Sequence, residues 1–158
     1  MNGKLVALII ILGALFSGFL LYYLQVYYFY KEIDSLDPKY EIRLLLKDNG
    51  AYDRIKVSQF IGIDADSSPL KFRGCFSTDV NNNYLKELYV EAYKPNPLTA
   101  PSWFECFNAR EIGEAINSGK AIAFISELNV HSGVDRVIAF FNNGKAYAWH
   151  QLNEKYTK

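Results

Sequence analysis

A long uninterrupted apolar stretch occupies the amino-terminal part of the chain. Leu5–Tyr30 holds 26 residues without a charged side chain. As a helix, Leu5–Leu24 would be about 30 Å long, which matches the hydrocarbon core of a bilayer. Aromatic residues, whose rings favour the membrane–water interface, line its end: Tyr22, Tyr23, Tyr27, Tyr28, Phe29 and Tyr30. The pattern predicts a transmembrane anchor over residues 1–30 with an aromatic rim.

Four small residues lie along one side of this predicted helix. Gly13 and Ser17 are four positions apart, as are Ala14 and Gly18, so they share a stripe on which a second helix can approach closely. We therefore expect two membrane contacts for the anchor: the lipid bilayer, and a membrane-protein partner that packs on the stripe.

The anchor is expected to remain in the mature protein. A cleaved signal peptide usually has an apolar region of only about 7–15 residues, followed by small residues at the cleavage site. Here the apolar run is longer and an aromatic rim follows it. The very short tail that holds Lys4 favours a cytoplasmic amino terminus, although basic residues also follow the helix. The predicted location is a bacterial inner membrane with the carboxyl-terminal domain in the periplasm.

Beyond the anchor, the pattern changes to the short segments of a folded domain. Residues 31–39 are charged, contain Pro38 and predict a linker, and residues 40–158 predict one extracytoplasmic domain. Tyr84–Tyr93 fits both a helix and a strand, and the nearby Pro95 favours a strand. Other strands are predicted at Tyr40–Lys47, Leu70–Ser77, Lys120–Ser126 (a central strand), Val134–Phe141 and Lys145–Leu152.

One helix of the domain is predicted together with its ends. Asn108 is a suitable N-cap, Glu111 stands three positions later, and Gly119 occupies the usual glycine position after a helix. The predicted fold class is therefore α+β: one transmembrane helix, followed by a small, mainly antiparallel sheet domain with one principal helix.

The last two strands form the clearest predicted hairpin, because Asn143-Gly144 is a strong two-residue turn. This turn would place Val137 opposite His150, and Asp135 on the same face as His150. Both faces of the hairpin are largely apolar, so we expect a cover on each side. The helix would cover one face, and a partner protein would cover the other.

The composition argues against nucleic acid as a partner and is sufficient for a folded domain. Hydrophobic residues make up 50% of the 158 positions, which is enough to build a core. Every charged residue except Lys4 follows residue 30, and the domain has a net charge of about −1. Nothing in this balance directs the chain to nucleic acid.

Few side chains are candidates for chemistry. The two cysteines, Cys75 and Cys106, predict a disulfide in an oxidising compartment. His150 and Asp135 form a predicted polar pair with a structural role. Asp64 and Asp66 begin like a calcium loop, but the glycine and glutamate that such a loop requires are missing. No catalytic motif, metal site or cofactor is predicted.

Several motifs along the chain resemble those of a known group of proteins. The group consists of short, functionally uncharacterised single-span proteins of alphaproteobacteria, some of which have been labelled histidine kinases. This resemblance implies a membrane protein and brings no activity with it. The motifs that carry it are Tyr22-Tyr23-Leu24-Gln25-Val26-Tyr27, Ile63-Asp64-Ala65-Asp66-Ser67-Ser68-Pro69, Cys75-Phe76, Trp103-Phe104-Glu105-Cys106-Phe107 and Trp149-His150-Gln151.

The favoured function from the sequence is a non-enzymatic accessory subunit or assembly factor. Its host would be a larger inner-membrane complex, for example a respiratory one. Two alternatives remain. The first is a periplasmic protein that handles thiols or metals, or hydrolyses a substrate, with Cys75, Cys106 and His150. The second is a ligand-sensing domain.

Overall fold

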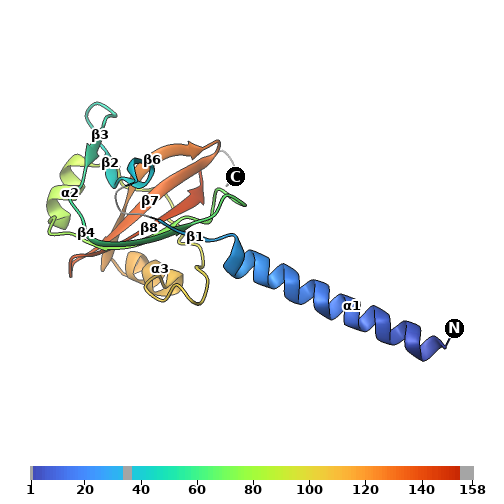
Figure 1. Ribbon diagram of the computed structural model, residues 1–158. Helices are drawn as coiled ribbons and strands as arrows, with labels where there is room; N and C mark the ends of the chain where they lie inside the picture. The colour runs from blue at the N-terminus through green and yellow to red at the C-terminus, as the bar shows by residue number, and fades with distance from the viewer. Residues whose placement is uncertain (1, 34–36, 154–158) are drawn as a thin grey trace.

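A long apolar helix and a folded domain make up the chain (Figure 1). The computed structural model describes residues 2–33 and 37–153. Residues 34–36 of the predicted linker and residues 154–158 of the predicted domain lie outside the described residues. Helix α1 (Gly3–Tyr23) continues as a π-helical turn, η1 (Leu24–Tyr28). Over 3–28 this segment is long and apolar enough to cross a membrane.

A six-stranded antiparallel sheet forms the centre of the domain. Its strands lie in the order β1-β4-β5-β8-β7-β6. Their bounds are β1 (Lys31–Ile33), β4 (Ser58–Asp64), β5 (Arg73–Ser77), β6 (Ala121–His131), β7 (Val134–Phe141) and β8 (Lys145–Leu152). The strands β5, β8 and β7 are apolar on both faces, so each face needs a cover.

Different elements cover the two faces (Figure 1). Helix α3 (Ala109–Asn117) and the loop before it cover the face that carries Val137 and Trp149. The other face, which carries Ile138 and Phe140, is covered by a second layer. This layer holds the 3₁₀ turn η2 (Pro38–Tyr40), the two-stranded sheet β2 (Arg43–Leu45) and β3 (Tyr52–Arg54), and helix α2 (Asn82–Leu88). The α+β class is confirmed.

The register of the last hairpin differs by one residue from the predicted one. Arg136 lies opposite His150, and Val137 lies opposite Trp149. The backbone N–H of Gly144 donates to the carbonyl of Phe141, and Gly144 has a φ of 81°. The turn is therefore longer than the predicted Asn-Gly loop and ends in a glycine with a left-handed conformation. Because a one-residue shift exchanges the faces of a strand, the predicted faces of this hairpin were wrong relative to each other.

Three other predictions need correction. Tyr84–Tyr93 was predicted as a strand, but its first part is helix α2 and only Tyr89 and Glu91 form bridges with strands. Lys120–Ser126 was predicted as a central strand, but β6 is last in the sheet order, and its outer side is bonded by the segment around Val90. The predicted linker begins with β1, which pairs with β4. Hydrogen bonds between distant segments decide the positions of β6 and β1, whereas helix α2 begins at a local cap, Asn81.

We predict that Gly144→Ala destabilises the domain by about 1–2 kcal/mol, because the added Cβ must adopt the left-handed conformation. It would also meet the carbonyl oxygen of Thr78 at 3.1 Å. Gly113→Ala is the matched control, since Gly113 lies in α3 and its Cβ would meet nothing within 4 Å. This control should stabilise the domain by about 0.5–1 kcal/mol. Denaturant unfolding of the full chain in detergent measures both, and equal effects would contradict the observed turn.

Candidate functional site

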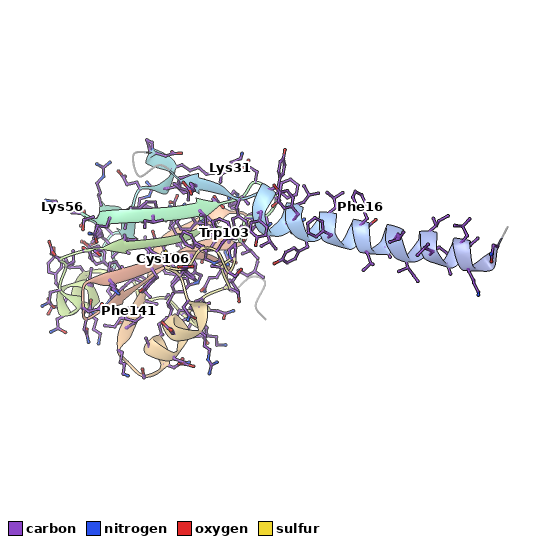
Figure 2. All side chains as sticks on the ribbon, turned by 60° about the horizontal axis from the view of Figure 1, so that its bottom comes forward. Phe16, Lys31, Lys56, Trp103, Cys106 and Phe141 are labelled. Atoms are coloured by element: carbon purple, nitrogen blue, oxygen red, sulfur yellow. A yellow bond between two sulfur atoms is a disulfide. The ribbon has the colours of Figure 1, made fainter. Side chains whose placement is uncertain are left out.

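The end of the apolar helix α1 is fixed to the domain through Trp103. The indole N–H of Trp103 donates to the carbonyl oxygen of Val26 at 2.7 Å. The Trp103 ring stacks on Tyr27 and meets the edge of Tyr30, with ring centroids 6.4 and 5.8 Å apart. In Figure 2, Trp103 lies on the side of the domain nearest the helix. The aromatic rim is therefore shared between the anchor and a loop of the domain.

A second contact to the helix end comes from a different loop. The ammonium of Lys71, which precedes β5, donates to the backbone and side-chain oxygens of Gln25 at 3.2 and 3.1 Å. It also lies 4.9 Å from the centre of the Tyr30 ring. The chain then enters β1 at Lys31, which pairs with Asp64. Two loops and one strand thus hold the helix end, and we call this arrangement the helix–domain junction.

The Trp103 loop is itself held to the sheet. Cys106 in this loop is joined by a disulfide to Cys75 of β5, with the Cα atoms 6.3 Å apart. The buried guanidinium of Arg73 donates to the carbonyls of Leu98 and Thr99 at 2.8 and 3.2 Å. Burial lowers the pKa of Arg73 to about 10, so it stays charged at neutral pH. Because the loop is bonded both to the sheet and to the helix end, it fixes the position of the helix end relative to the sheet.

An apolar groove runs beside this loop, on the same face of the sheet as α3 but over β4, which α3 does not cover. At its centre is Ile61 of β4, whose side chain lies on the same face as Cys75 and is 57% exposed. Two adjoining hollows of about 420 and 510 Å³ share the residues Phe60, Ile61 and Cys106. The carboxylates of Glu32 and Glu105 border the hollow nearer the helix. We call this surface the Ile61 groove.

The predicted pair of His150 and Asp135 does not form. His150 lies on the opposite face of the hairpin from Asp135, because of the one-residue difference in register. Its Nε2 accepts from Nε of Arg136 at 3.2 Å, and its Nδ1 lies 2.8 Å from the carbonyl oxygen of Pro69. Since Arg136 can only donate, the proton of the neutral ring is on Nδ1 and donates to Pro69. Asp135 instead accepts from the backbone N–H of Asn129.

The His150 ring is a buried, neutral part of a polar cluster. Burial, followed in importance by the positive charge of Arg136, lowers the pKa of His150 to about 3. The Arg136 guanidinium lies 4.7 Å from the centre of the Phe72 ring and donates to the carbonyl of Lys39. Cys75 points to the other face of the sheet, because it pairs with Tyr147 rather than with a neighbour on the His150 side. The two cysteines and His150 are thus not brought together.

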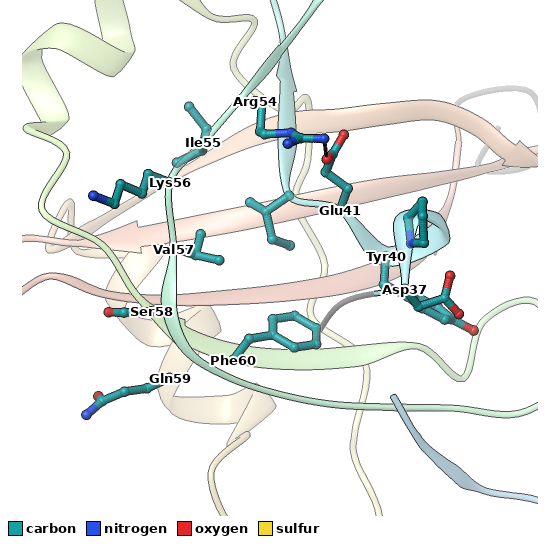
Figure 3. Close-up of a pocket in the computed structure, with 12 residues that line it drawn as sticks. Asp37, Tyr40, Glu41, Arg54, Ile55, Lys56, Val57, Ser58, Gln59 and Phe60 are labelled. Atoms are coloured by element: carbon teal, nitrogen blue, oxygen red, sulfur yellow. Dashed lines mark ion pairs between the residues drawn. The ribbon is translucent and has the colours of Figure 1, made fainter. Parts of the chain in front are cut away.

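A separate cleft of about 530 Å³ lies between η2 and the segment 54–60 (Figure 3). Phe60 and Val57 point toward its interior, and an ion pair between Arg54 and Glu41 borders it. Lys56 points away from it in this view. Among the described residues, no group of three or more His, Cys, Asp or Glu side chains could hold a metal ion. The cleft thus offers apolar surface and one charged rim.

Sequence patterns did not identify several residues that shape these sites. Arg73, Trp103 and Arg136 act through partners that lie 25 to 97 positions away in the chain. The helix stripe was predicted, and the structure leaves open space next to Gly13 and Gly18. The exposed position of Ile61 had no local signal. The cluster of aromatic residues next to Trp103 was the one feature of the sequence that pointed to the junction.

Comparison with known proteins gives a family without an activity. A family model described as a family of unknown function (DUF6446) matches residues 42–158. No curated protein matches the chain, and no solved structure does. The matched segment contains five of the six strands of the sheet, the disulfide, the Trp103 loop and most of the Ile61 groove, whereas the helix α1 and the strand β1 precede it.

We predict that the stability of the domain falls as the pH decreases from about 6.5 toward 3. The unfolded chain binds a proton at the ordinary pKa of His150, whereas the folded chain does so only near 3. Its contribution is therefore complete above the ordinary pKa and is lost below it, by up to about 1.4 kcal/mol per pH unit. Urea unfolding of the full chain in detergent, at pH ~7 and ~5, measures the difference.

His150→Gln should reduce this pH dependence, because a glutamine amide can donate to Pro69 and accept from Arg136 without titrating. His131→Gln removes the neighbouring exposed ring, 6.1 Å from that of His150, and should change the pH dependence much less. An unchanged pH dependence in His150→Gln would contradict a buried neutral His150.

We also predict that loss of the disulfide lowers the free energy of unfolding by about 3–4 kcal/mol, because the bond closes a loop of 31 residues. The variant Cys106→Ala and the double variant Cys75→Ala/Cys106→Ala should lose similar amounts. Alkylation of the denatured chain, purified without reductant, tests the bond directly. Modification of both cysteines under these conditions would contradict it.

Proposed function

Since this chain belongs to the family of unknown function DUF6446, we propose its role from its own structure. It acts as a non-enzymatic single-pass membrane protein, an accessory subunit or assembly factor of a larger inner-membrane complex. The amino terminus is cytoplasmic and the domain is periplasmic. The observation that carries the proposal is the helix–domain junction, which gives the anchor and the domain a fixed relation to each other.

The junction favours an uncleaved anchor. Val26 and Gln25, which accept the hydrogen bonds of Trp103 and Lys71, belong to the same helical segment that crosses the bilayer. Removal of this segment would leave the indole N–H and the ammonium without these acceptors and would expose the Trp103 ring. A signal peptide has no need of such contacts with the folded domain.

Two uncovered surfaces support a protein partner. The small-residue stripe has no contact within 4 Å at Gly13 or Gly18. The Ile61 groove presents apolar surface next to the disulfide, on the same part of the domain as Trp103. Because the junction fixes the two surfaces relative to each other, one partner that contacts both gains affinity without reordering the chain.

The two alternatives have weaker support. A thiol or metal protein would need Cys75, Cys106 and His150 near each other, but the cysteines form a disulfide and His150 lies on the other face. A ligand-sensing domain would use the cleft beside Arg54 and Glu41, whose volume lies in the usual range for small-molecule sites. Its charged rim is already satisfied internally by the ion pair.

We predict that the full chain, tagged at its carboxyl terminus and extracted in mild detergent, co-purifies with a larger membrane protein in a constant ratio. Gly13→Leu/Gly18→Leu should reduce recovery of that protein at least about tenfold, because added side chains prevent close helix approach. Ile61→Glu should weaken it as well. Leu12→Phe is the control, since it adds volume on the opposite side of the helix.

The result that would contradict the proposal is a chain that is recovered alone, as a monomer, from its native membrane. Equal loss of the partner in Leu12→Phe and in the stripe variant would contradict the assigned surface. Blue-native electrophoresis of the extracted membranes distinguishes these outcomes.

A further inference from the structure

We infer that the domain itself rests on the bilayer, and that Trp103 and Lys71 contact the lipid headgroups. This goes beyond partner binding, because the ligand is the lipid surface and the site belongs to the folded domain. It rests on the proposed membrane anchoring of α1.

The depth of Trp103 follows from the length of the helix. Lys4 and Lys31 flank the uncharged run, and the 21 residues of α1 rise by about 31 Å, close to the thickness of the hydrocarbon core. The segment beyond Tyr23 therefore lies in the headgroup layer. Trp103 binds the carbonyl of Val26 at 2.7 Å, so its ring lies at the same depth.

The contacts leave little room between the domain and the bilayer. Lys71 reaches Gln25 from the loop between β4 and β5, and Trp103 reaches Val26 from the loop before α3. The first strand begins at Lys31, a few residues after η1 ends. A domain on a flexible tether would have none of these bonds.

The strand directions place one end of the sheet toward the membrane. Neighbouring antiparallel strands put Lys31, Asp64, Arg73 and Trp149 side by side near this end. The loop that carries Lys71 joins β4 to β5 here, next to the helix end (Figure 1). Lys56, by contrast, lies at the end of the domain away from the helix (Figure 2).

The chemistry of the site matches the headgroup layer. An indole ring combines an apolar body with a polar N–H, and a lysine ammonium extends from an apolar stem, which are the features that favour the membrane interface. Trp103 is half-buried against Tyr27 and Tyr30, so one part of its ring remains available to lipid. The Lys71 ammonium can bind a phosphate oxygen while it keeps its bonds to Gln25.

Tryptophan fluorescence of the full chain in phosphatidylcholine vesicles tests this inference. The chain has 2 tryptophans, and Trp149 is fully buried in the core. Lipids brominated near the carbonyl end of the acyl chain should remove roughly half of the emission, because they reach only Trp103. The variant Trp103→Phe should lose almost none. Lipids brominated near the terminal methyl should quench less, since the ring lies at the surface.

Charge reversal provides a second readout. Lys71→Glu should reduce the shallow quenching, because a carboxylate repels lipid phosphates. Lys145→Glu is the matched control, since Lys145 begins β8 at the opposite end of the sheet. Its quenching should equal that of the unmodified chain.

The inference is overturned if the shallow bromines quench the unmodified chain no more than Trp103→Phe, or if aqueous iodide quenches Trp103 freely. Flotation of the vesicles after an alkaline wash first shows whether the chain is inserted. A chain that does not float overturns both the anchoring and this inference. Failure to find a protein partner, in contrast, leaves the lipid contact intact.

Discussion

The need to bury both faces of the β5–β8–β7 strands organises the whole domain. No single helix can cover two faces, so the chain supplies α3 and the Trp103 loop on one side and the β2–β3 layer with α2 on the other. The covers lie mainly over the three neighbouring strands β5, β8 and β7. On the α3 side they end before β4, and Ile61 is left exposed at that boundary. The Ile61 groove is thus a consequence of where the cover on the α3 side stops.

Sequence reasoning succeeded where the decisive interactions are local. The apolar run of α1, the Asn108 cap of α3 and the two strands around Gly144 each carry their own signal. It failed where distant hydrogen bonds decide. Lys120–Ser126 was predicted as a central strand, but β6 is last in the sheet order because the segment around Val90 bonds to Ile125 on its outer side, and this partner is not visible from the residues of the strand itself. A turn one residue longer than expected was enough to exchange the faces of the hairpin.

The candidate sites show the same division. The stripe on helix α1 was accessible to a periodicity argument, whereas the junction depends on hydrogen bonds between residues 46 and 77 positions apart. Arg136 replaced Asp135 as the neighbour of His150, which changes a carboxylate partner for a cationic one. The ring is therefore kept neutral, and the pair belongs to the structural core rather than to acid–base chemistry.

The π-helical turn η1 affects how the domain is rotated about the axis of helix α1. Each residue of an α-helix advances by about 100° around the axis, whereas a π-helical turn holds about one residue more for the same rotation. Leu24–Tyr28 therefore sets the rotation about the helix axis that relates the small-residue stripe of α1 to the Ile61 groove. The segment thus determines the direction in which the groove faces relative to the stripe, and so whether one neighbouring protein could contact both.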